Sequence, residues 1–250
     1  TIFNPVTKES FLYNNYGDSE KSLSDKFIYP MLKDREGGVW IGTYYNGINY
    51  LPPYCGQFNG YSESSDIPYF NSRIISRFCE GENGNIWIAS DDSGLSCFNP
   101  STMQFIDFNG REKLNKKNLP ALCMVGTDLW IGTYGDGIQI LNTQTGEIKS
   151  YNTTNGLDEN SIYSIFKDSQ GQIWTGSMNG ICQYDAQKQH FTPIKHLEAL
   201  IIEIVEDAKG NLWIATQGKG LFRYSPQKNK EWEKYGLEKG FNSLTFNHLC

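Results

Sequence analysis

The side chains that most often act as nucleophiles, general bases or metal ligands are scattered in this sequence. The three histidines, His190, His196 and His248, lie in unrelated sequence contexts. The six cysteines form no CxxC pair and no short Cys/His spacing of the kind that builds a zinc site. The sequence also lacks a G-x-S-x-G elbow, a P-loop and an H-E-x-x-H motif. We therefore expect no catalytic residue, no metal site and no cofactor in this segment.

Five of the cysteines fall within strand-like apolar runs, where cysteine usually acts as a small buried hydrophobe. They are Cys79, Cys97, Cys123, Cys182 and Cys250. We expect these residues to be unpaired structural thiols.

A different chemistry, the binding of sugars, is open to tyrosines and aspartates that gather in turns. Aromatic planes bind the apolar C–H faces of sugars, and planar polar groups bind their hydroxyls. The candidate ligand-binding residues are Tyr44, Tyr45, Asp91, Asp92, Tyr134 and Asp136. The alternative is that they are ordinary solvated turn residues, because turns favour Asn, Asp and Gly in any case.

These turns belong to a repeat that occurs five times. Its copies are VWIGTYYNGI, IWIASDDSGL, LWIGTYGDGI, IWTGSMNGI and LWIATQGKGL. Their tryptophans, at steps of 47, 43, 44 and 39 residues, are Trp40, Trp87, Trp130, Trp174 and Trp213. A period of 40 to 50 residues is typical of four-stranded β-propeller blades.

Each tryptophan starts a pattern that suits a strand packed between neighbouring sheets. Because side chains alternate along a strand, Trp40 and Gly42 share one face. The residue two positions after each tryptophan is always Gly or Ala, so one sheet can approach the next closely there. We therefore assign the repeated tryptophans a structural role rather than a ligand-stacking one.

Three further strands can be placed around each tryptophan strand. We label them a to d from the axis outward: an apolar run (a), the tryptophan strand (b), and two short strands (c and d). Strand b occurs five times and the others six times, because 2–16 supplies c and d and 241–250 supplies a. The fold prediction is an all-β propeller with antiparallel blades in one domain over 1–250, excerpted from a longer chain. Either six blades are present, one of them short of a strand, or the array is part of seven or more blades.

An aspartate recurs six residues before three of the tryptophans, at Asp34, Asp168 and Asp207. A recurrent turn aspartate usually caps its own backbone, so we expect a structural role.

This repeated sequence resembles the two-component regulator propeller repeat. The pattern N-S-I, then D-x-x-G-x-[IL]-W-I-G-T, then G-[IL]-x-x-[YF] is most complete at 160–184 and 206–224. The sequence departs from it at 125–130, where the turn between strands a and b is shortened, and at Met178–Asn179, where the b–c turn is one residue shorter. Both departures argue against a uniform ligand site in every repeat.

This resemblance implies the periplasmic sensor region of a hybrid two-component histidine kinase of the Bacteroidetes type. It implies an extracytoplasmic segment of an inner-membrane protein that responds to a glycan fragment and controls polysaccharide-utilisation genes. The expected partners are an oligosaccharide and an adjacent propeller or sandwich domain of the same chain, with a homodimer left open. The alternatives are a propeller enzyme, such as a polysaccharide or lactone lyase or a glycoside hydrolase, and a protein-interaction scaffold.

Composition excludes two other classes of partner. The net charge of −6 disfavours nucleic acid, because the 22 Lys and Arg are scattered rather than gathered into a stripe. The sequence lacks the roughly 18 consecutive apolar residues needed to span a bilayer, so we expect no direct membrane insertion of this segment.

Overall fold

The computed structural model describes residues 2–3, 7–11, 22–54, 57–63, 66–114, 118–195, 197–226 and 231–246. The chain forms two compact units. The first comprises residues 1–108 with 116–118, and the second comprises residues 109–115 with 119–250. The expectation of one domain over the whole chain stays a prediction.

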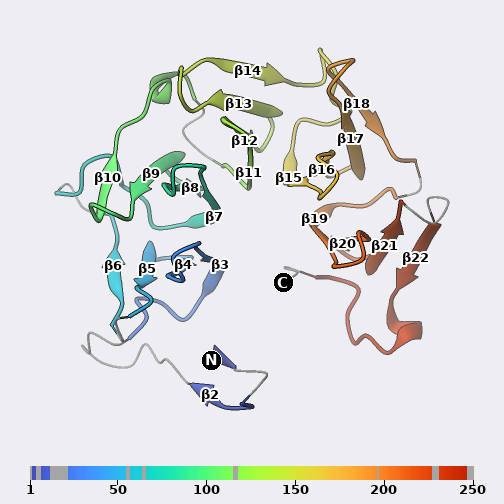
Figure 1. The fold of residues 1–250 in the computed structure, drawn as a ribbon. Helices are drawn as coiled ribbons and strands as arrows, with labels where there is room; N and C mark the ends of the chain where they lie inside the picture. Colours follow the sequence, from blue (N-terminus) through green and yellow to red (C-terminus); the bar gives the residue numbers. More distant parts are fainter. Residues whose placement is uncertain are drawn as a thin grey trace. The chain divides into compact units, whose positions relative to one another are not determined.

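The first unit contains one two-stranded sheet and two four-stranded blades (Figure 1). The two-stranded sheet pairs β1 (Ile2–Phe3) with β2 (Ser10–Phe11). Blade 1 consists of β3 (Ile28–Lys33), β4 (Val39–Thr43), β5 (Ile48–Leu51) and β6 (Asn59–Tyr61). Blade 2 consists of β7 (Ile75–Glu80), β8 (Ile86–Ser90), β9 (Leu95–Asn99) and β10 (Gln104–Ile106).

The second unit contains three four-stranded blades. Blade 3 consists of β11 (Ala121–Val125), β12 (Asp128–Gly132), β13 (Ile138–Asn142) and β14 (Ile148–Tyr151). Blade 4 consists of β15 (Ile162–Lys167), β16 (Ile173–Ser177), β17 (Ile181–Asp185) and β18 (His190–Pro193). Blade 5 consists of β19 (Ile201–Glu206), β20 (Leu212–Thr216), β21 (Leu221–Ser225) and β22 (Glu231–Tyr235).

The all-β prediction is confirmed. Every blade pairs its four strands antiparallel and in sequence order, and the only helices among the described residues are two short 3₁₀ turns, Arg111–Lys113 and Leu237–Lys239. Five complete blades are described, so a total of six or more stays a prediction.

The sixth inner strand expected at 241–250 is not formed in its described part, 241–246, and 247–250 lie outside the described residues. One hydrogen bond of the described part nevertheless matches the bond at which the inner strand of blade 4 begins. The Phe246 N–H donates to the Thr216 carbonyl at 3.3 Å, as the Ile162 N–H donates to the Thr133 carbonyl at 3.0 Å.

Three of the repeated tryptophans contact an aromatic ring of the following blade. Trp40 is completely buried, and its ring centroid lies 4.9 Å from that of Phe98 in blade 2. In the second unit Trp130 meets Tyr184 of blade 4 at 5.0 Å, and Trp174 meets Tyr224 of blade 5 at 5.8 Å. These indoles therefore fill the contacts between blades.

The small residue on the tryptophan face lies against the inner strand of the following blade. A Cβ placed on Gly42 would lie 2.8 Å from Ile75, and one on Gly176 would lie 2.5 Å from Ile201. These separations are below any normal carbon contact, so the blades approach as closely as the sequence predicted.

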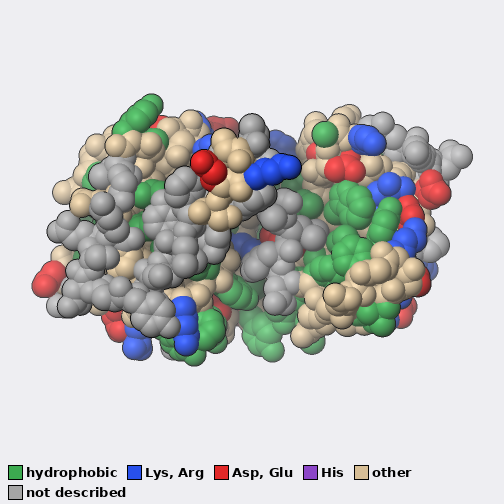
Figure 2. All heavy atoms as spheres, turned by 90° about the horizontal axis from the view of Figure 1, so that it is seen from below, with side chains coloured by type: hydrophobic (Ala, Val, Ile, Leu, Met, Phe, Trp, Pro, Cys, Tyr) green, Lys and Arg blue, Asp and Glu red, His purple; other side chains and the backbone are tan. Residues whose placement is uncertain are grey.

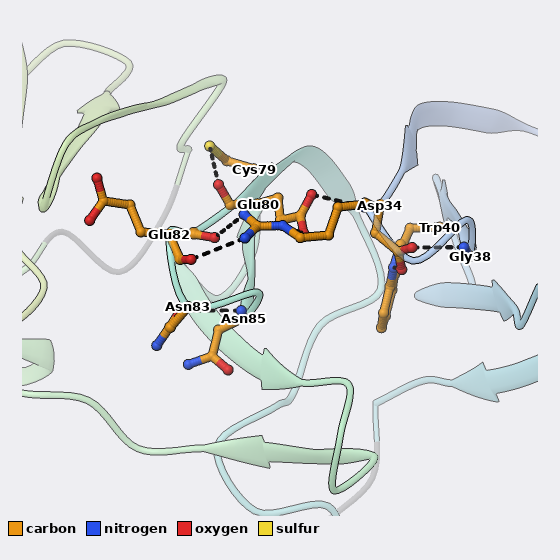
Figure 3. A network of polar contacts seen from close by, with 10 residues as sticks. Asp34, Gly38, Trp40, Cys79, Glu80, Glu82, Asn83 and Asn85 are labelled. Carbon is orange, nitrogen blue, oxygen red and sulfur yellow. Dashed lines mark hydrogen bonds and ion pairs between the residues drawn. The ribbon is translucent and has the colours of Figure 1, made fainter.

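The recurrent aspartate does more than cap a turn. In Figure 3 the Asp34 carboxylate accepts a bond from the Gly38 N–H at 2.7 Å and one from the Trp40 indole N–H at 2.9 Å. Asp168 holds Trp174 in the same way, at 2.8 Å. The structural role is confirmed, and the indole bond is an addition that the sequence analysis missed.

The same a–b turns also reach across to the next blade. The Arg35 guanidinium donates to the Glu80 carboxylate at 2.5 Å and to the Gly81 and Glu82 carbonyls at 2.7 and 3.0 Å, within the network of Figure 3. In the second unit the Ser169 hydroxyl donates to the Glu206 carboxylate at 2.8 Å. Both acceptors end an inner strand, so these contacts tie neighbouring blades together on one face.

Of the cysteines, Cys79, Cys97, Cys123 and Cys182 lie within strands, as predicted, and Cys97 and Cys182 are buried. Cys55 and Cys250 lie outside the described residues. Burial raises the pKa of the Cys123 thiol to about 11, which keeps it protonated and unreactive near neutral pH.

Two surface properties bear on the predicted partners. On the face shown in Figure 2, Lys and Arg side chains are interspersed with acidic, polar and hydrophobic ones. In the described part of the chain, no helix is both long and apolar enough to cross a membrane.

Candidate functional site

The candidate site residues stand on b–c turns that are fixed by a repeated hydroxyl. A buried Thr or Ser ends each tryptophan strand or, in blade 3, directly follows it. Its hydroxyl donates to the carbonyl of the turn glycine, at 3.0 Å from Thr43 to Gly47 and 2.9 Å from Thr133 to Gly137. The sequence analysis missed this hydroxyl, although every copy of the repeat carries it: Thr43, Ser90, Thr133, Ser177 and Thr216.

The b–c turn of blade 1 lies beside the segment that leads into the inner strand. The Tyr44 N–H donates to the Phe27 carbonyl at 3.1 Å, and the Tyr45 N–H donates to the Asp25 carboxylate at 3.0 Å. These bonds place Phe27, which the sequence analysis did not select, next to the two candidate tyrosines.

Four aromatic side chains form a continuous surface here, which we call the blade 1 aromatic surface: Phe27, Tyr29, Tyr44 and Tyr45. Tyr44 and Tyr45 meet at 4.8 Å between ring centroids, Phe27 lies 6.1 Å from Tyr45, and Tyr29 lies 6.4 Å from Tyr44. All contacts are edge-to-face. The four side chains are between 41% and 55% exposed, so each offers part of its ring to solvent.

Two other exposed side chains of β3 have a simpler explanation. Ile28 and Met31 align with Ile162 and Ile165 of blade 4, which are buried among residues of blade 3 such as Trp130. No tryptophan precedes Trp40 in the sequence, and the described residues before β3 form only β1 and β2, so they supply no tryptophan strand to cover Ile28 and Met31. We therefore leave Ile28 and Met31 out of the candidate site.

Charged groups lie at the Tyr29 end of the surface. Burial, followed by the nearby Asp91 carboxylate, raises the pKa of the Tyr29 phenol, and Arg77 acts in the opposite direction. Burial and Asp92 raise the pKa of Asp91. The charges of an acidic and a basic side chain of blade 2 therefore act on the phenol in opposite directions.

Asp92 is engaged in holding the backbone. Its carboxylate accepts a bond from the Ser72 hydroxyl at 2.5 Å and one from the Arg73 N–H at 3.0 Å. These bonds match the solvated-turn alternative better than a ligand contact, and we assign Asp92 a structural role.

The remaining candidates, Tyr134 and Asp136, belong to the second unit. The Tyr134 ring is 58% exposed and meets Tyr163 at 6.2 Å, edge-to-face. The Asp136 N–H donates to the Thr133 hydroxyl at 3.1 Å, as in an ordinary turn. The six candidates thus divide into two groups, Tyr44, Tyr45, Asp91 and Asp92 in one unit, and Tyr134 and Asp136 in the other.

The chemistry open to this arrangement is binding. Partly exposed rings beside a carboxylate and a guanidinium can stack on a sugar and hydrogen-bond its hydroxyls. Within the described residues, no group of three or more His, Cys, Asp or Glu is arranged to hold a metal ion. His190, the one histidine in that part of the chain, is exposed on the outermost strand of blade 4.

Comparison with known proteins identifies the repeat. The family model described as "Two component regulator propeller" matches residues 22–45 and 156–179. These segments contain the whole inner strand and the whole tryptophan strand of blades 1 and 4. Histidine kinase P4 of Formosa agariphila is 33% identical over 72 residues, which are 24% of this chain and 5% of that protein.

Solved structures share the fold. The extracellular domain of a hybrid two-component system of B. thetaiotaomicron matches with a TM-score of 0.81 at 20% identity, over 94% of this chain and 32% of that one. Virginiamycin B lyase of Staphylococcus aureus matches with a TM-score of 0.65 at 15% identity, over 87% of this chain and 71% of that one.

This chain therefore spans about one twentieth of the curated relative and about a third of the extracellular domain. The matched segments coincide with the repeats on which two of the five blades are built. Residues 22–45 and 156–179 thus match the two-component regulator propeller repeat that the sequence analysis recognised.

Proposed function

We propose that this chain is a non-catalytic ligand-recognition segment of an extracytoplasmic two-component sensor, and that it binds a glycan fragment on the blade 1 aromatic surface. The observation that carries the proposal is the set of four half-exposed rings in edge-to-face contact, Phe27, Tyr29, Tyr44 and Tyr45. Soluble domains bury most such rings, and a rigid turn that holds them at the surface favours recognition.

The relatives support the sensor assignment. A histidine kinase shares the repeat, and an extracellular domain of a hybrid two-component system shares the fold. We accordingly propose that the segment lies in the periplasm, as part of an inner-membrane protein that controls polysaccharide-utilisation genes. Its neighbours would be another propeller or a sandwich domain of the same chain, and a homodimer would couple two such sensors.

A propeller lyase is the second candidate, and it is favoured only by the fold of virginiamycin B lyase, of which a histidine variant is described as catalytically inactive. At this level of identity the likeness bears on the fold and not on the reaction.

The experiment is a calorimetric titration of the chain with neutral plant and host oligosaccharides. Tyr45→Ala is expected to weaken binding at least about tenfold, since it removes a stacking ring. Tyr134→Ala is the matched control, because Tyr134 is an equally exposed turn tyrosine in the other unit. Loss of binding in Tyr134→Ala alone, or no binding by the wild type, would refute the proposed site.

A further inference from the structure

A tryptophan strand covers the inner strand of the blade that follows it. The small residue two positions after the tryptophan lies on an isoleucine there: a Cβ on Gly42 would lie 2.8 Å from Ile75, and one on Gly132 would lie 3.1 Å from a side-chain carbon of Ile162. Both isoleucines are at most 1% exposed. This contact needs glycine or alanine, because a larger side chain would enter the isoleucine.

The indole covers the third strand of the same following blade. The rings that it meets are Phe98 in blade 2, Tyr184 in blade 4 and Tyr224 in blade 5. All three pair with the residue that precedes the tryptophan of their own blade. In blade 1 this position belongs to Leu51, which pairs with Val39.

Blade 1 has the same face, but no described residue covers its inner part. Ile28 and Met31 are 40% and 56% exposed. Val39 and Leu51 are half-buried, whereas the two equivalent side chains of blade 2 are completely buried. We call these four residues the blade 1 open face.

The other junctions specify what fits this face. Neighbouring apolar side chains that are exposed together mark an interaction surface. In a strand, residues two positions apart share one face, so a strand of the pattern W-x-[GA] would place its indole on Leu51 and its small residue on Ile28. A larger residue at the second position would collide with Ile28, which makes the face selective for the pattern.

We propose that the blade 1 open face is the docking surface for the tryptophan strand of a neighbouring propeller blade that carries the pattern W-x-[GA]. This inference rests on the part of the proposed function that gives the segment a propeller neighbour, and it does not depend on glycan binding. It assigns to that neighbour a surface separate from the blade 1 aromatic surface.

The probe is a synthetic peptide of residues 129–142, which holds the tryptophan strand, the b–c turn and the third strand of blade 3, with a lysine tail for solubility. The readout is the oxidation of Met31 by hydrogen peroxide, followed by mass spectrometry. We expect saturating peptide to slow sulfoxide formation at Met31 at least about fivefold, because docking buries the thioether. Met178, a similarly exposed methionine of the second unit, is the internal control and should keep its rate.

A matched peptide tests the fit. Gly132→Leu keeps the tryptophan and adds apolar surface, so non-specific adhesion would be at least as strong. Docking as proposed requires this peptide to bind at least about tenfold more weakly, since its leucine would enter Ile28. In the chain, Ile28→Asp should keep the melting temperature, because Ile28 is exposed, and should abolish the protection of Met31.

The outcomes separate this inference from glycan binding. No protection by either peptide, or equal protection by both, would overturn the docking surface. Self-association of the chain that Ile28→Asp abolishes would assign the face to a second copy and would also overturn the proposed occupant. Glycan binding that depends on Tyr45, without peptide docking, would keep the proposed ligand site and reject this inference alone.

Discussion

The inner strands of blade 1 and blade 4 carry the same repeat but bury different parts of it. Ile162 and Ile165 of β15 are 1% and 7% exposed, whereas Ile28 and Met31, at the same positions of β3, are 40% and 56% exposed. The difference lies in the preceding strand: Gly132 of β12 packs against Ile162, whereas the described residues before Ile28 include no tryptophan strand. Burial along an inner strand is therefore set by its neighbour.

The residue before the strand differs for another reason. Blade 4 has the buried Ser161 there, in the family pattern N-S-I, and blade 1 has the exposed Phe27, in K-F-I. A serine keeps this face polar and small, while Phe27 extends the row of tyrosines on the b–c turn. The departure from the family pattern thus coincides with the candidate site.

The largest loss of stability is expected from removing the indoles of the tryptophan strands. Trp174→Ala should lower the free energy of unfolding by about 3 to 5 kcal/mol, because it empties a buried space and leaves Asp168 without its donor. Trp213→Ala, in the half-buried equivalent of blade 5, should cost less. Denaturant unfolding measures both, and equal losses would contradict the packing role.

The second-largest loss of stability is expected from substitutions in the inner strands. Ile162→Ala should cost about 2 to 5 kcal/mol, and Ile28→Ala should stay within about 0.5 kcal/mol, since it is already exposed. The comparison would fail if Ile28→Ala destabilised the chain as strongly as Ile162→Ala in thermal melts.

Overpacking the close approach between blades is expected to cost less. Gly176→Leu should lower stability by about 1 to 3 kcal/mol, because its side chain would enter Ile201. Gly60→Leu is the matched control, since a Cβ on Gly60 meets no atom within 4 Å. Equal melting temperatures for the two variants would refute the packing argument.

The smallest effect concerns acid stability. Burial alone would raise the pKa of Asp207, but bonds from the Asn211 and Trp213 side chains outweigh it and hold the pKa below its ordinary value. Its contribution to stability is therefore present above about pH 4 and is lost as the pH falls further. Asp207→Asn should lower the melting temperature at pH 7 and converge with wild type at low pH, whereas the exposed Glu147→Gln should track wild type throughout.

The fold was predictable because it repeats. The tryptophan spacing, the small residue after each tryptophan and the turn glycines each recur, so one copy supports the interpretation of the others. The spacing revealed the aspartates that precede Trp40, Trp174 and Trp213. It did not reveal that each of these carboxylates accepts a hydrogen bond from the indole N–H.

The candidate site was less predictable, because it depends on what breaks the repeat. Tyr44, Tyr45 and Asp91 were found as polar and aromatic turn residues. Phe27 and Tyr29 were missed, since an aromatic residue at a strand start predicts burial as readily as exposure. The register shift between Ile28 and Met31, on either side of Tyr29, could not be inferred from the alternation of side chains along the sequence.

The most direct test of the account uses one substitution and two readouts. Phe27→Ser gives blade 1 the residue that blade 4 has at this position, and its melting temperature and its glycan affinity are measured together. Because Phe27 is half exposed and serves the surface rather than the core, we predict an unchanged melting temperature and at least about a tenfold loss of affinity. A lowered melting temperature with wild-type affinity would contradict the account.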